Sequence, residues 1–279
     1  MSMGFRITFL GTGGGRHTTM YQTRCTGGFL IEHDGKFLHV DPGPGALAQM
    51  QRIRYDLTRT DSVIVSHCHP DHYSDAESVI EGITRGGWVK RGSLYGSRTV
   101  MEGSGGLGPA LSRYHLTLPE RTRVFEPGDV LDVDGMRTDV CVAKHSDPTN
   151  VGFRFDTGNG TLSYVSDTEY SDEIADQYRG SRVLLLPITT PSGNRIRYHM
   201  CTDDAIPFVE RVRPELAIFV HLGVVILRKG PDAQAKMVED ATGVRTMAAE
   251  DLMTLDIDDE LRLGKAETHE EPWIPDSAP

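Results

Sequence analysis

The sequence predicts an α/β protein in which two mixed β-sheets pack face to face and carry helices on their outer sides. Short apolar runs of strand character recur along the 279 residues, glycine- and proline-rich turns separate them, and helical stretches are inserted at intervals. The sequence contains no repeat at the spacing of solenoid proteins. With 38% hydrophobic and 25% charged residues, the chain can bury one full core or two modest ones.

The first half of the chain predicts four strands and two helices. Each expected strand is a short apolar run that ends at turn-forming residues, and each expected helix has apolar residues at helical spacing. The strands are expected at residues 5–10, 28–32, 36–40 and 61–66, and the helices at residues 46–54 and 75–84.

The second half repeats this style. Thr202 or Asp203 is suited to cap the helix that follows it. The strands are expected at residues 130–133, 138–144, 152–155, 161–166, 183–187 and 216–221, and the helices at residues 172–178, 202–212 and 232–242.

Two segments depart from this pattern. Between residues 85 and 127, glycine pairs and a Gly-Pro step interrupt any long element, which predicts an irregular insertion or a lid over the substrate. The segment 265–279 combines acidic residues and prolines with little apolar content, and we expect a flexible C-terminal tail. The remainder, residues 1–264, is predicted to form a single domain that includes the insertion.

Composition excludes several classes of protein. The 40 acidic and 29 basic residues give a net charge of -11, which argues against binding of extended nucleic acid and leaves a small-molecule or nucleotide-type substrate. No run approaches the roughly 20 apolar residues of a membrane span, and the first ten residues lack the features of a signal peptide. We therefore expect a cytoplasmic protein without membrane contact.

The four cysteines form no Cys-x-x-Cys pair, so neither a disulfide framework nor a zinc knuckle is predicted.

The most informative segment is an apolar strand, residues 63–65, that runs into a His-x-His-x-Asp-His motif. Three imidazoles and a carboxylate so close together have no use in packing, because each buried polar ring needs a partner. A bound cation meets that need. His67 and His69 lie two residues apart and face the same way in an extended segment, while Asp71 and His72 in the following turn can reach a second ion.

Three later segments deliver one further ligand each at the end of an apolar run. These ligands are His145, Asp167 and His221. Each alone fits a structural residue as well, but together with the histidine motif they indicate a metal site. The sequence therefore predicts seven candidate ligands contributed by four strand ends.

This pattern resembles the metallo-β-lactamase superfamily, whose five motifs occur here in the family's order. Asp41 matches the first motif, the segment from His67 to His72 the second, and His145, Asp167 and His221 the third, fourth and fifth. The resemblance covers roughly residues 5–225 and implies an αββα sandwich with two metal ions at one edge. It therefore identifies the predicted domain as a hydrolase domain.

By this resemblance, His67, His69 and His145 hold one ion, Asp71, His72 and His221 hold the other, and Asp167 bridges them. Asp41 is expected to orient the histidine motif through hydrogen bonds rather than to bind metal. Two divalent ions about 3.5 to 4 Å apart can lower the pKa of a shared water towards 7 and hold the bridging hydroxide for attack. Zinc is the expected metal, and the imidazole and carboxylate ligands also suit manganese and iron.

Two further features resemble ribonuclease Z and related phosphodiesterases. A glycine-rich loop, residues 11–15, follows the first strand, and His199 lies between the fourth and fifth motifs, where that branch carries a histidine that assists the leaving oxygen. The catalytic residues are therefore predicted to be Asp71, at the metals, and His199, as the general acid. His69 stands where the iron-dependent branch of the family has a glutamate, which favours a hydrolase.

The chain also departs from ribonuclease Z. No carboxylate follows the strand at 183–187, and no long basic arm corresponds to the one that captures tRNA. These departures favour a smaller phosphodiester, such as a cyclic phosphate or nucleotide, over tRNA. The expected phosphate contacts are Arg16, Arg24, Arg195 and Arg197.

The ligand set alone leaves three functions open. A phosphodiesterase is the first. A hydrolase of a lactone, thioester or other carboxylic ester or amide is the second, because the same nucleophile attacks a carbonyl carbon. A non-catalytic binding protein on the same fold is the third, although this chain keeps every ligand position. The sequence also leaves the oligomeric state open, with a homodimer among the arrangements.

Overall fold

The computed structural model describes residues 4–275, and the chain divides into two compact units. The first unit comprises Met1–Gly11, Cys25–Phe125 and Glu250–Pro279, and the second comprises Thr12–Arg24 and Glu126–Ala249. Each unit has its own β-sheet, so the chain contributes two mixed sheets flanked by helices, and the predicted fold class is confirmed. The assignment of residues 1–264 to a single domain stays a prediction.

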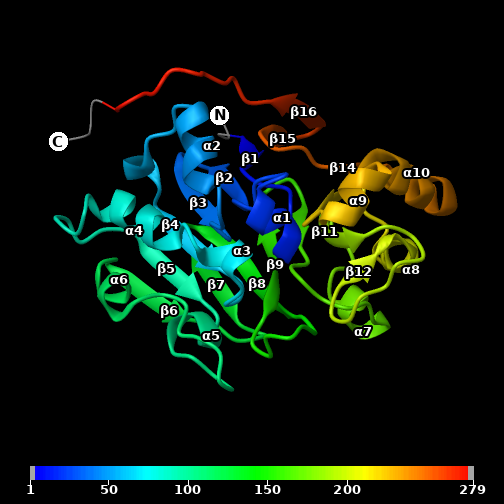
Figure 1. Cartoon of the computed structure of the whole chain (residues 1–279), viewed down its shortest axis with the longest axis horizontal. Coiled ribbons are helices and arrows are strands. Elements are labelled where there is room, and N and C mark those ends of the chain that lie inside the picture. The colour runs from blue at the N-terminus through cyan, green and yellow to red at the C-terminus, as the bar shows by residue number, and fades with distance from the viewer. Residues whose placement is uncertain (1–3, 276–279) are drawn as a thin grey trace. The chain divides into compact units, whose positions relative to one another are not determined.

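The first unit contains an eight-stranded sheet in the order β16-β15-β1-β2-β3-β4-β5-β6 (Figure 1). The pairs from β16 to β3 are antiparallel, and those from β3 to β6 are parallel. The strands are β1 (Phe5–Phe9), β2 (Phe29–His33), β3 (Lys36–Val40), β4 (Ser62–Val65), β5 (Ser93–Gly96), β6 (Arg121–Val124), β15 (Met253–Ile257) and β16 (Leu261–Lys265).

The helices of this unit are short, and α4 packs against the sheet through one apolar side. Ala76, Val79, Ile80 and Ile83 lie on one side of α4 at helical spacing and pack with apolar residues of β4 and β5. The helices are α2 (Ala46–Arg52), α3 (Pro70–Tyr73), α4 (Ala76–Thr84), α5 (Arg98–Met101), α6 (Arg113–Thr117) and the 3-10 helix η1 (Leu57–Arg59).

The second unit contains a sheet in the order β14-β13-β11-β10-β9-β8-β7, with β12 paired to β11. Strands β10, β11, β13 and β14 are parallel, and β7 to β10 are antiparallel. The strands are β7 (Val130–Val133), β8 (Met136–Val142), β9 (Val151–Asp156), β10 (Thr161–Tyr164), β11 (Val183–Thr190), β12 (Met200–Cys201), β13 (Leu216–Val220) and β14 (Thr246–Ala248).

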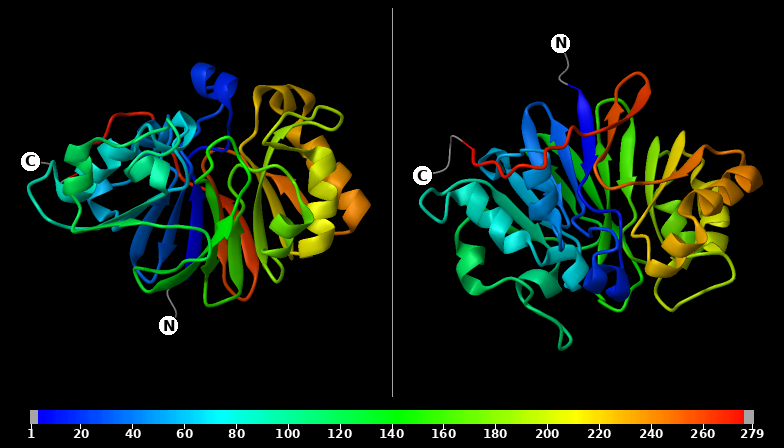
Figure 2. Two further views of the ribbon diagram at one scale, coloured as in Figure 1. Left: turned by 90° about the horizontal axis from the view of Figure 1, so that it is seen from below. Right: turned by 45° about the horizontal axis from the view of Figure 1, so that its top comes forward.

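Helices α8 and α10 lie side by side along this second sheet (Figure 2). Phe208 of α8 and Val238 of α10 pack in one buried cluster with Leu184 and Leu186 of β11 and Phe219 of β13. Every residue of β11 is buried, as its continuous apolar run predicts. The helices of this unit are α1 (Arg16–Tyr21), α7 (Asp172–Asp176), α8 (Thr202–Val212), α9 (Val224–Lys229) and α10 (Pro231–Thr242).

The segment 85–127 is not irregular throughout. It contains β5, α5, α6 and β6. Strand β5 pairs in parallel with β4 and β6 pairs in parallel with β5, so both strands extend the first sheet. Whether part of it closes over a substrate stays a prediction. Outside this segment, the elements that the sequence did not predict are η1, α1, α3, α9, β12, β14, β15 and β16.

Described residues of the expected tail contact α2. The backbone amide of His269 donates to the carbonyl of Arg52 at 2.7 Å, and Gln51 Nε2 donates to the carbonyl of Trp273 at 2.8 Å. Residues 276–279 of that tail lie outside the described residues. Within residues 4–275, no helix is long and apolar enough to cross a membrane.

Candidate functional site

In the first unit, the His-x-His-x-Asp-His motif follows directly from β4, whose four residues are all buried. His69 has an extended backbone, and Pro70 then starts α3, since proline suits the first position of a helix. This turn places Asp71 and His72 on α3 while His67 and His69 precede it. His67 is completely buried, and His72 is 4% exposed.

Asp41, the residue after β3, accepts hydrogen bonds from the motif. Its two carboxylate oxygens accept from the backbone amide and the hydroxyl of Ser66, each at 2.7 Å, and Oδ2 also lies 2.9 Å from Nδ1 of His72. Ser66 Oγ lies 3.0 Å from Nδ1 of His67. Because the hydroxyl proton points to Asp41, the Nδ1 atoms of His67 and His72 are the donors in these pairs.

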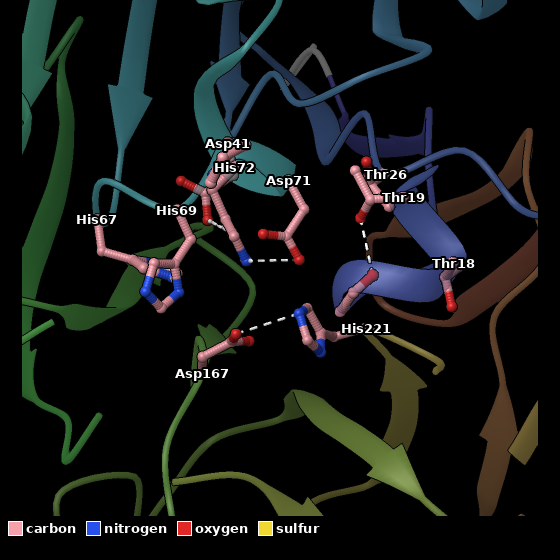
Figure 3. Close-up of polar contacts among 12 residues, drawn as sticks. Thr18, Thr19, Thr26, Asp41, His67, His69, Asp71, His72, Asp167 and His221 are labelled. Carbon is pink, nitrogen blue, oxygen red and sulfur yellow. Dashed lines mark hydrogen bonds and ion pairs between the residues drawn. The ribbon is translucent and has the colours of Figure 1, made fainter. Parts of the chain in front are cut away.

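These contacts leave Nε2 of His67 and His72 unprotonated, which is the form that binds a metal ion. Nε2 of His67 lies 3.1 Å from Nδ1 of His69. Two nitrogens bound tetrahedrally to zinc at about 2.05 Å would lie about 3.3 Å apart, so this spacing suits two ligands of one ion. Figure 3 shows His72 between Asp41 and Asp71, whose Oδ2 lies 3.8 Å from His72 Nε2.

In the second unit, a second cluster is centred on the buried carboxylate of Asp167, three residues beyond the end of β10. Asp167 Oδ2 lies 3.1 Å from Nε2 of His221, 3.7 Å from Nδ1 of His199 and 3.8 Å from Nε2 of His145. The contact between Asp167 and His221 is visible in Figure 3. Nδ1 of His145 donates to the carbonyl of Tyr198 at 3.1 Å, which directs Nε2 of that ring to the carboxylate.

Thr189, near the end of β11, connects two of these imidazoles. Its hydroxyl oxygen lies 3.0 Å from Nδ1 of His221 and 3.3 Å from Nδ1 of His199. A hydroxyl can donate to one nitrogen and accept from the other, so a single threonine fixes the orientation of both rings. The two rings are stacked, with centroids 5.6 Å apart and planes 13° from parallel. Thr189 was not predicted as a site residue, because the sequence signal sought after this strand was a carboxylate.

Exposure separates His199 from its neighbours. The side chain of His199 is 19% exposed, whereas those of His145, Asp167 and His221 are 0%, 2% and 5% exposed. His199 also lines a cavity of about 390 Å³, along with residues of α1 and α9. It is therefore the one imidazole of this cluster that a solute in the cavity can contact.

The glycine-rich loop also contacts this cluster, at Gly14. A Cβ atom at this position would lie 2.1 Å from Cδ2 of His221, and its amide donates to the carbonyl of Leu222 at 3.2 Å. Only glycine therefore lets the backbone pass so close to the imidazole. The glycine-rich loop noted in the sequence therefore lies against a candidate ligand, and Gly14 is the residue in contact.

The four arginines predicted as phosphate contacts lie in different surroundings. Arg16 is exposed and lines the cavity beside His199. Arg24 donates to Thr12 Oγ1 at 2.9 Å, Arg195 pairs with a carboxylate on α8 at 2.8 Å, and Arg197 lies over the ring of Tyr198. Of the four arginines, Arg16 is the one that lines this cavity.

A buried histidine, His39, lies two residues before Asp41 on β3. Its Nε2 donates to the carbonyl of Gly27 at 2.8 Å. Burial lowers the pKa of His39 to about 4, against the raising effects of this hydrogen bond and of Asp41. His39 therefore stays neutral at physiological pH and serves the fold rather than proton transfer.

Both clusters have the chemistry of metal sites. In the second unit, Asp167, His199 and His221 each offer one ligand atom, and these atoms lie within 4.8 Å of one another. In the first unit, His67, His69, Asp71 and His72 supply imidazoles and a carboxylate from one short segment that ends on α3. These donors suit divalent transition metals, and the buried hydrogen bonds to the imidazoles fix the tautomers that a metal needs.

Comparison with known proteins agrees with this ligand chemistry. Residues 36–222 match the model of the β-lactamase superfamily domain, which is about two thirds of the chain. An uncharacterized protein of Methanocaldococcus jannaschii is 38% identical over 88% of this chain and 93% of its own length.

Two further similarities concern proteins of named type. The ribonuclease Z of Methanosarcina acetivorans is 30% identical over 144 residues, which span 52% of this chain and 46% of that enzyme. Among solved structures, the metallo-β-lactamase fold protein YhfI of Bacillus subtilis superposes with a TM-score of 0.76 at 19% identity, covering 91% of this chain and 99% of that one. At this identity the structural likeness concerns the fold alone.

Proposed function

The chain belongs to the metallo-β-lactamase superfamily, as a member similar to ribonuclease Z, and within this family of hydrolases we propose that it is a phosphodiesterase acting on a small, nucleotide-type substrate. The observation that carries the proposal is the position of His199. This imidazole is stacked on His221 and held by Thr189, yet it remains the most accessible member of its cluster and lines a cavity.

The metal ligands follow the family's pattern. We assign His67, His69 and His145 to one ion, Asp71, His72 and His221 to the other, and Asp167 to both. When bound, divalent ions at such ligands lower the pKa of a coordinated water and stabilise negative charge on phosphoryl oxygens. Zinc is the proposed metal, because imidazole and carboxylate ligands suit it, and manganese and iron are the alternatives.

Asp41 has the role of a positioning residue. Its carboxylate holds the hydroxyl of Ser66 and Nδ1 of His72, and through Ser66 it also fixes the ring of His67. Each of these imidazoles consequently presents its unprotonated Nε2. Removal of the carboxylate would free both rings to rotate or change tautomer, which typically costs 10- to 100-fold in metal affinity.

His199 supplies the proton for the leaving group. In hydrolysis, a water oxygen bonds to phosphorus while the bond from phosphorus to the leaving oxygen breaks. The attacking water gives up one proton to the solvent. The leaving oxygen keeps the electron pair of the broken bond and takes a proton from Nε2 of the protonated His199 ring, which regains a proton from the solvent afterwards. Thr189 holds Nδ1 of the same ring, which assigns Nε2 to the proton transfer.

This arrangement favours a phosphodiester over a lactone. An alkoxide leaving from phosphorus needs a proton at a site separate from the nucleophile, and His199 meets that need from a cavity wall. The similarity to ribonuclease Z, a phosphodiester hydrolase, also supports the proposal. A carboxylic ester, thioester or lactone remains the second candidate, because the same ligands serve attack on a carbonyl carbon.

Side-by-side kinetics test the proposal. The purified protein, loaded separately with zinc and with manganese, is assayed on bis(p-nitrophenyl) phosphate and on dihydrocoumarin, an activated lactone. We expect kcat/KM for the diester to exceed that for the lactone by at least about tenfold. Preferential hydrolysis of the lactone would contradict the phosphodiesterase assignment.

Metal content and a pair of variants complete this test. Elemental analysis should find close to two ions per chain, and fewer than one would exclude the two-metal site. Asp167→Asn should abolish diester hydrolysis. Asp172→Asn, a matched change at a carboxylate whose side chain is 58% exposed on α7, should leave the rate unchanged.

The remaining sequence predictions stay predictions. They concern a cytoplasmic location, a homodimer, phosphate contacts by the arginines, and a lid within residues 85–127. The net charge of -11 supports a small substrate over extended nucleic acid, since a chain of phosphates is repelled along its whole length.

A further inference from the structure

The cavity beside His199 lies entirely within the second unit and has walls of two kinds. Arg16 and His17, at the start of α1, form a basic wall, and both are exposed. Ile196, Val224 and Val225, from the loop after β11 and the start of α9, form an apolar wall. At about 390 Å³ the cavity is near the lower end of the range for small-molecule sites, about 300 to 1,000 Å³.

Charge distinguishes this cavity from the rest of the molecule. The chain carries 40 acidic residues, yet none of the described residues that line the cavity is an aspartate or glutamate. The lining contributes one guanidinium and two imidazoles instead. A cavity with this excess of positive charge in an acidic protein suits an anionic ligand.

The apolar wall is held in place by hydrogen bonds. The loop that carries Ile196 is tied to α8 through Asp203, whose carboxylate accepts from Ser192 Oγ at 2.6 Å and from the amide of Gly193 at 2.8 Å. Ile196 nevertheless remains 41% exposed and Val225 37% exposed. Exposed apolar side chains on an ordered wall suit the face of a ring or another apolar group of a ligand.

We propose that this cavity is the leaving-group subsite of the enzyme, and that it takes an organic phosphate in which an anionic group is joined to an apolar ring, as in a mononucleotide. The proposal rests on the proposed function, because His199 marks the side on which the leaving oxygen departs. The apolar wall contacts the ring, and Arg16 and His17 contact the second anionic group. The preferred substrate is consequently a phosphodiester whose leaving alcohol carries a further phosphate.

Calorimetric titration of the metal-loaded protein with three probes tests this assignment. The probes are adenosine 5′-monophosphate, which carries both the ring and the anion, adenosine, which carries the ring alone, and inorganic phosphate, which is the anion alone. We expect the monophosphate to bind at least tenfold more tightly than either of the others. Equal affinity for the monophosphate and inorganic phosphate would overturn the proposal, since it would place binding at the metals only.

Two variants and one control separate the walls. Arg16→Gln should weaken binding of the monophosphate by about tenfold and leave that of adenosine unchanged, whereas Ile196→Ala should weaken both by a few fold. Arg228→Gln removes the same charge from an exposed position on α9 outside the cavity and should change neither. An Arg16→Gln variant with wild-type affinity for the monophosphate would refute the assignment.

The binding data and the diester assay fail independently. If the protein binds the monophosphate as expected but hydrolyses no diester, the proposed function is wrong and the leaving-group role falls with it. If the protein hydrolyses bis(p-nitrophenyl) phosphate but both cavity variants bind the monophosphate with wild-type affinity, the enzyme assignment stands and the subsite assignment is wrong.

Discussion

Gly14→Ala is the substitution whose effect follows most directly from the geometry. The added methyl carbon would lie 2.1 Å from Cδ2 and 2.4 Å from Nε2 of His221. Because carbon atoms in contact prefer about 3.5 to 4.0 Å, the ring or the loop must move by more than about 1 Å. Thr189 and Asp167 hold the ring at 3.0 and 3.1 Å, so this movement breaks at least one of the two contacts.

The expected cost of Gly14→Ala is larger for the site than for the fold. A displacement of about 1 Å in a catalytic site costs on the order of 100-fold in rate. Overpacking of a close contact destabilises a fold by about 1 to 3 kcal/mol. We therefore expect kcat/KM on bis(p-nitrophenyl) phosphate to fall by about 100-fold, with weaker metal binding, while the protein still folds.

Steady-state kinetics, elemental analysis and thermal unfolding check these three effects on one protein preparation. Gly4→Ala is the control, because a methyl carbon there meets only the flexible end of the Asp258 side chain, at 3.0 Å. It should keep wild-type kinetics and metal content. If Gly14→Ala also kept the wild-type rate and both ions, then close packing of this loop on His221 would have no part in the site.

Four further predictions concern single features of the chain. His199→Ala should keep its metal ions. Its rate should fall about 10²- to 10⁴-fold on a diester with a poor alkoxide leaving group, but far less on an activated aryl diester. Equal losses on both substrates, or loss of metal, would show that His199 is a ligand or a structural residue. Asp167→Ala should release at least one ion per chain, as measured by elemental analysis. Without the carboxylate proposed to bind both cations, their mutual repulsion is no longer offset. Deletion of residues 103–109 should change KM or substrate preference more than metal content, and unchanged kinetics on every substrate would make the segment a mere connection. Because buried His39 stays neutral in the folded protein, the free energy of unfolding should fall by about 3 kcal/mol in total as the pH decreases from 6.5, the ordinary histidine pKa, to about 4. Between these pH values only the unfolded state takes up the proton. Urea unfolding at several pH values with a chelator present measures this loss, and His39→Gln should remove it.

Local sequence pattern predicted the strands that deliver the candidate ligands. The strand before His67 is a continuous apolar run, and in the structure all four residues of β4 are buried. The same holds for β13, whose five residues are all buried before His221. Such runs can be recognised without tertiary information, because burial on both sheet faces requires apolar residues at every position.

Elements that depend on distant partners were not predicted. Strand β15 pairs with β1 in a register that joins Phe5 to Ile257, at opposite ends of the chain. Strand β6 contains two arginines and a threonine before its last valine, and it forms through parallel pairing with β5 rather than through an apolar pattern of its own. Pairing partners decide these segments, and a single sequence does not reveal them.

The role of Thr189 in orienting two imidazoles was not predicted, for a different reason. No carboxylate follows the predicted strand 183–187, which is a departure from ribonuclease Z. In the structure β11 continues to Thr190, and the hydroxyl of Thr189 lies between His199 and His221. A hydroxyl can orient an imidazole as a carboxylate does, but without adding negative charge beside the ring. The missing carboxylate is therefore compatible with a positioned acid.

The backbone around the candidate ligands explains why motif recognition alone does not yield the site. Asp41, Ser166 and His221 each follow a strand, and they have φ angles of 52°, 57° and 55° in the left-handed region. Such a conformation costs a non-glycine residue about 1 to 2 kcal/mol, so other contacts must hold it. At position 166, glycine would relieve that strain. It would also remove the hydroxyl that donates to Asn150 Oδ1 at 3.1 Å, and the amide of Asn150 in turn donates to the carbonyl of Asp167. The strained serine therefore helps to fix the backbone of Asp167 through Asn150, a residue that lies elsewhere in the sequence.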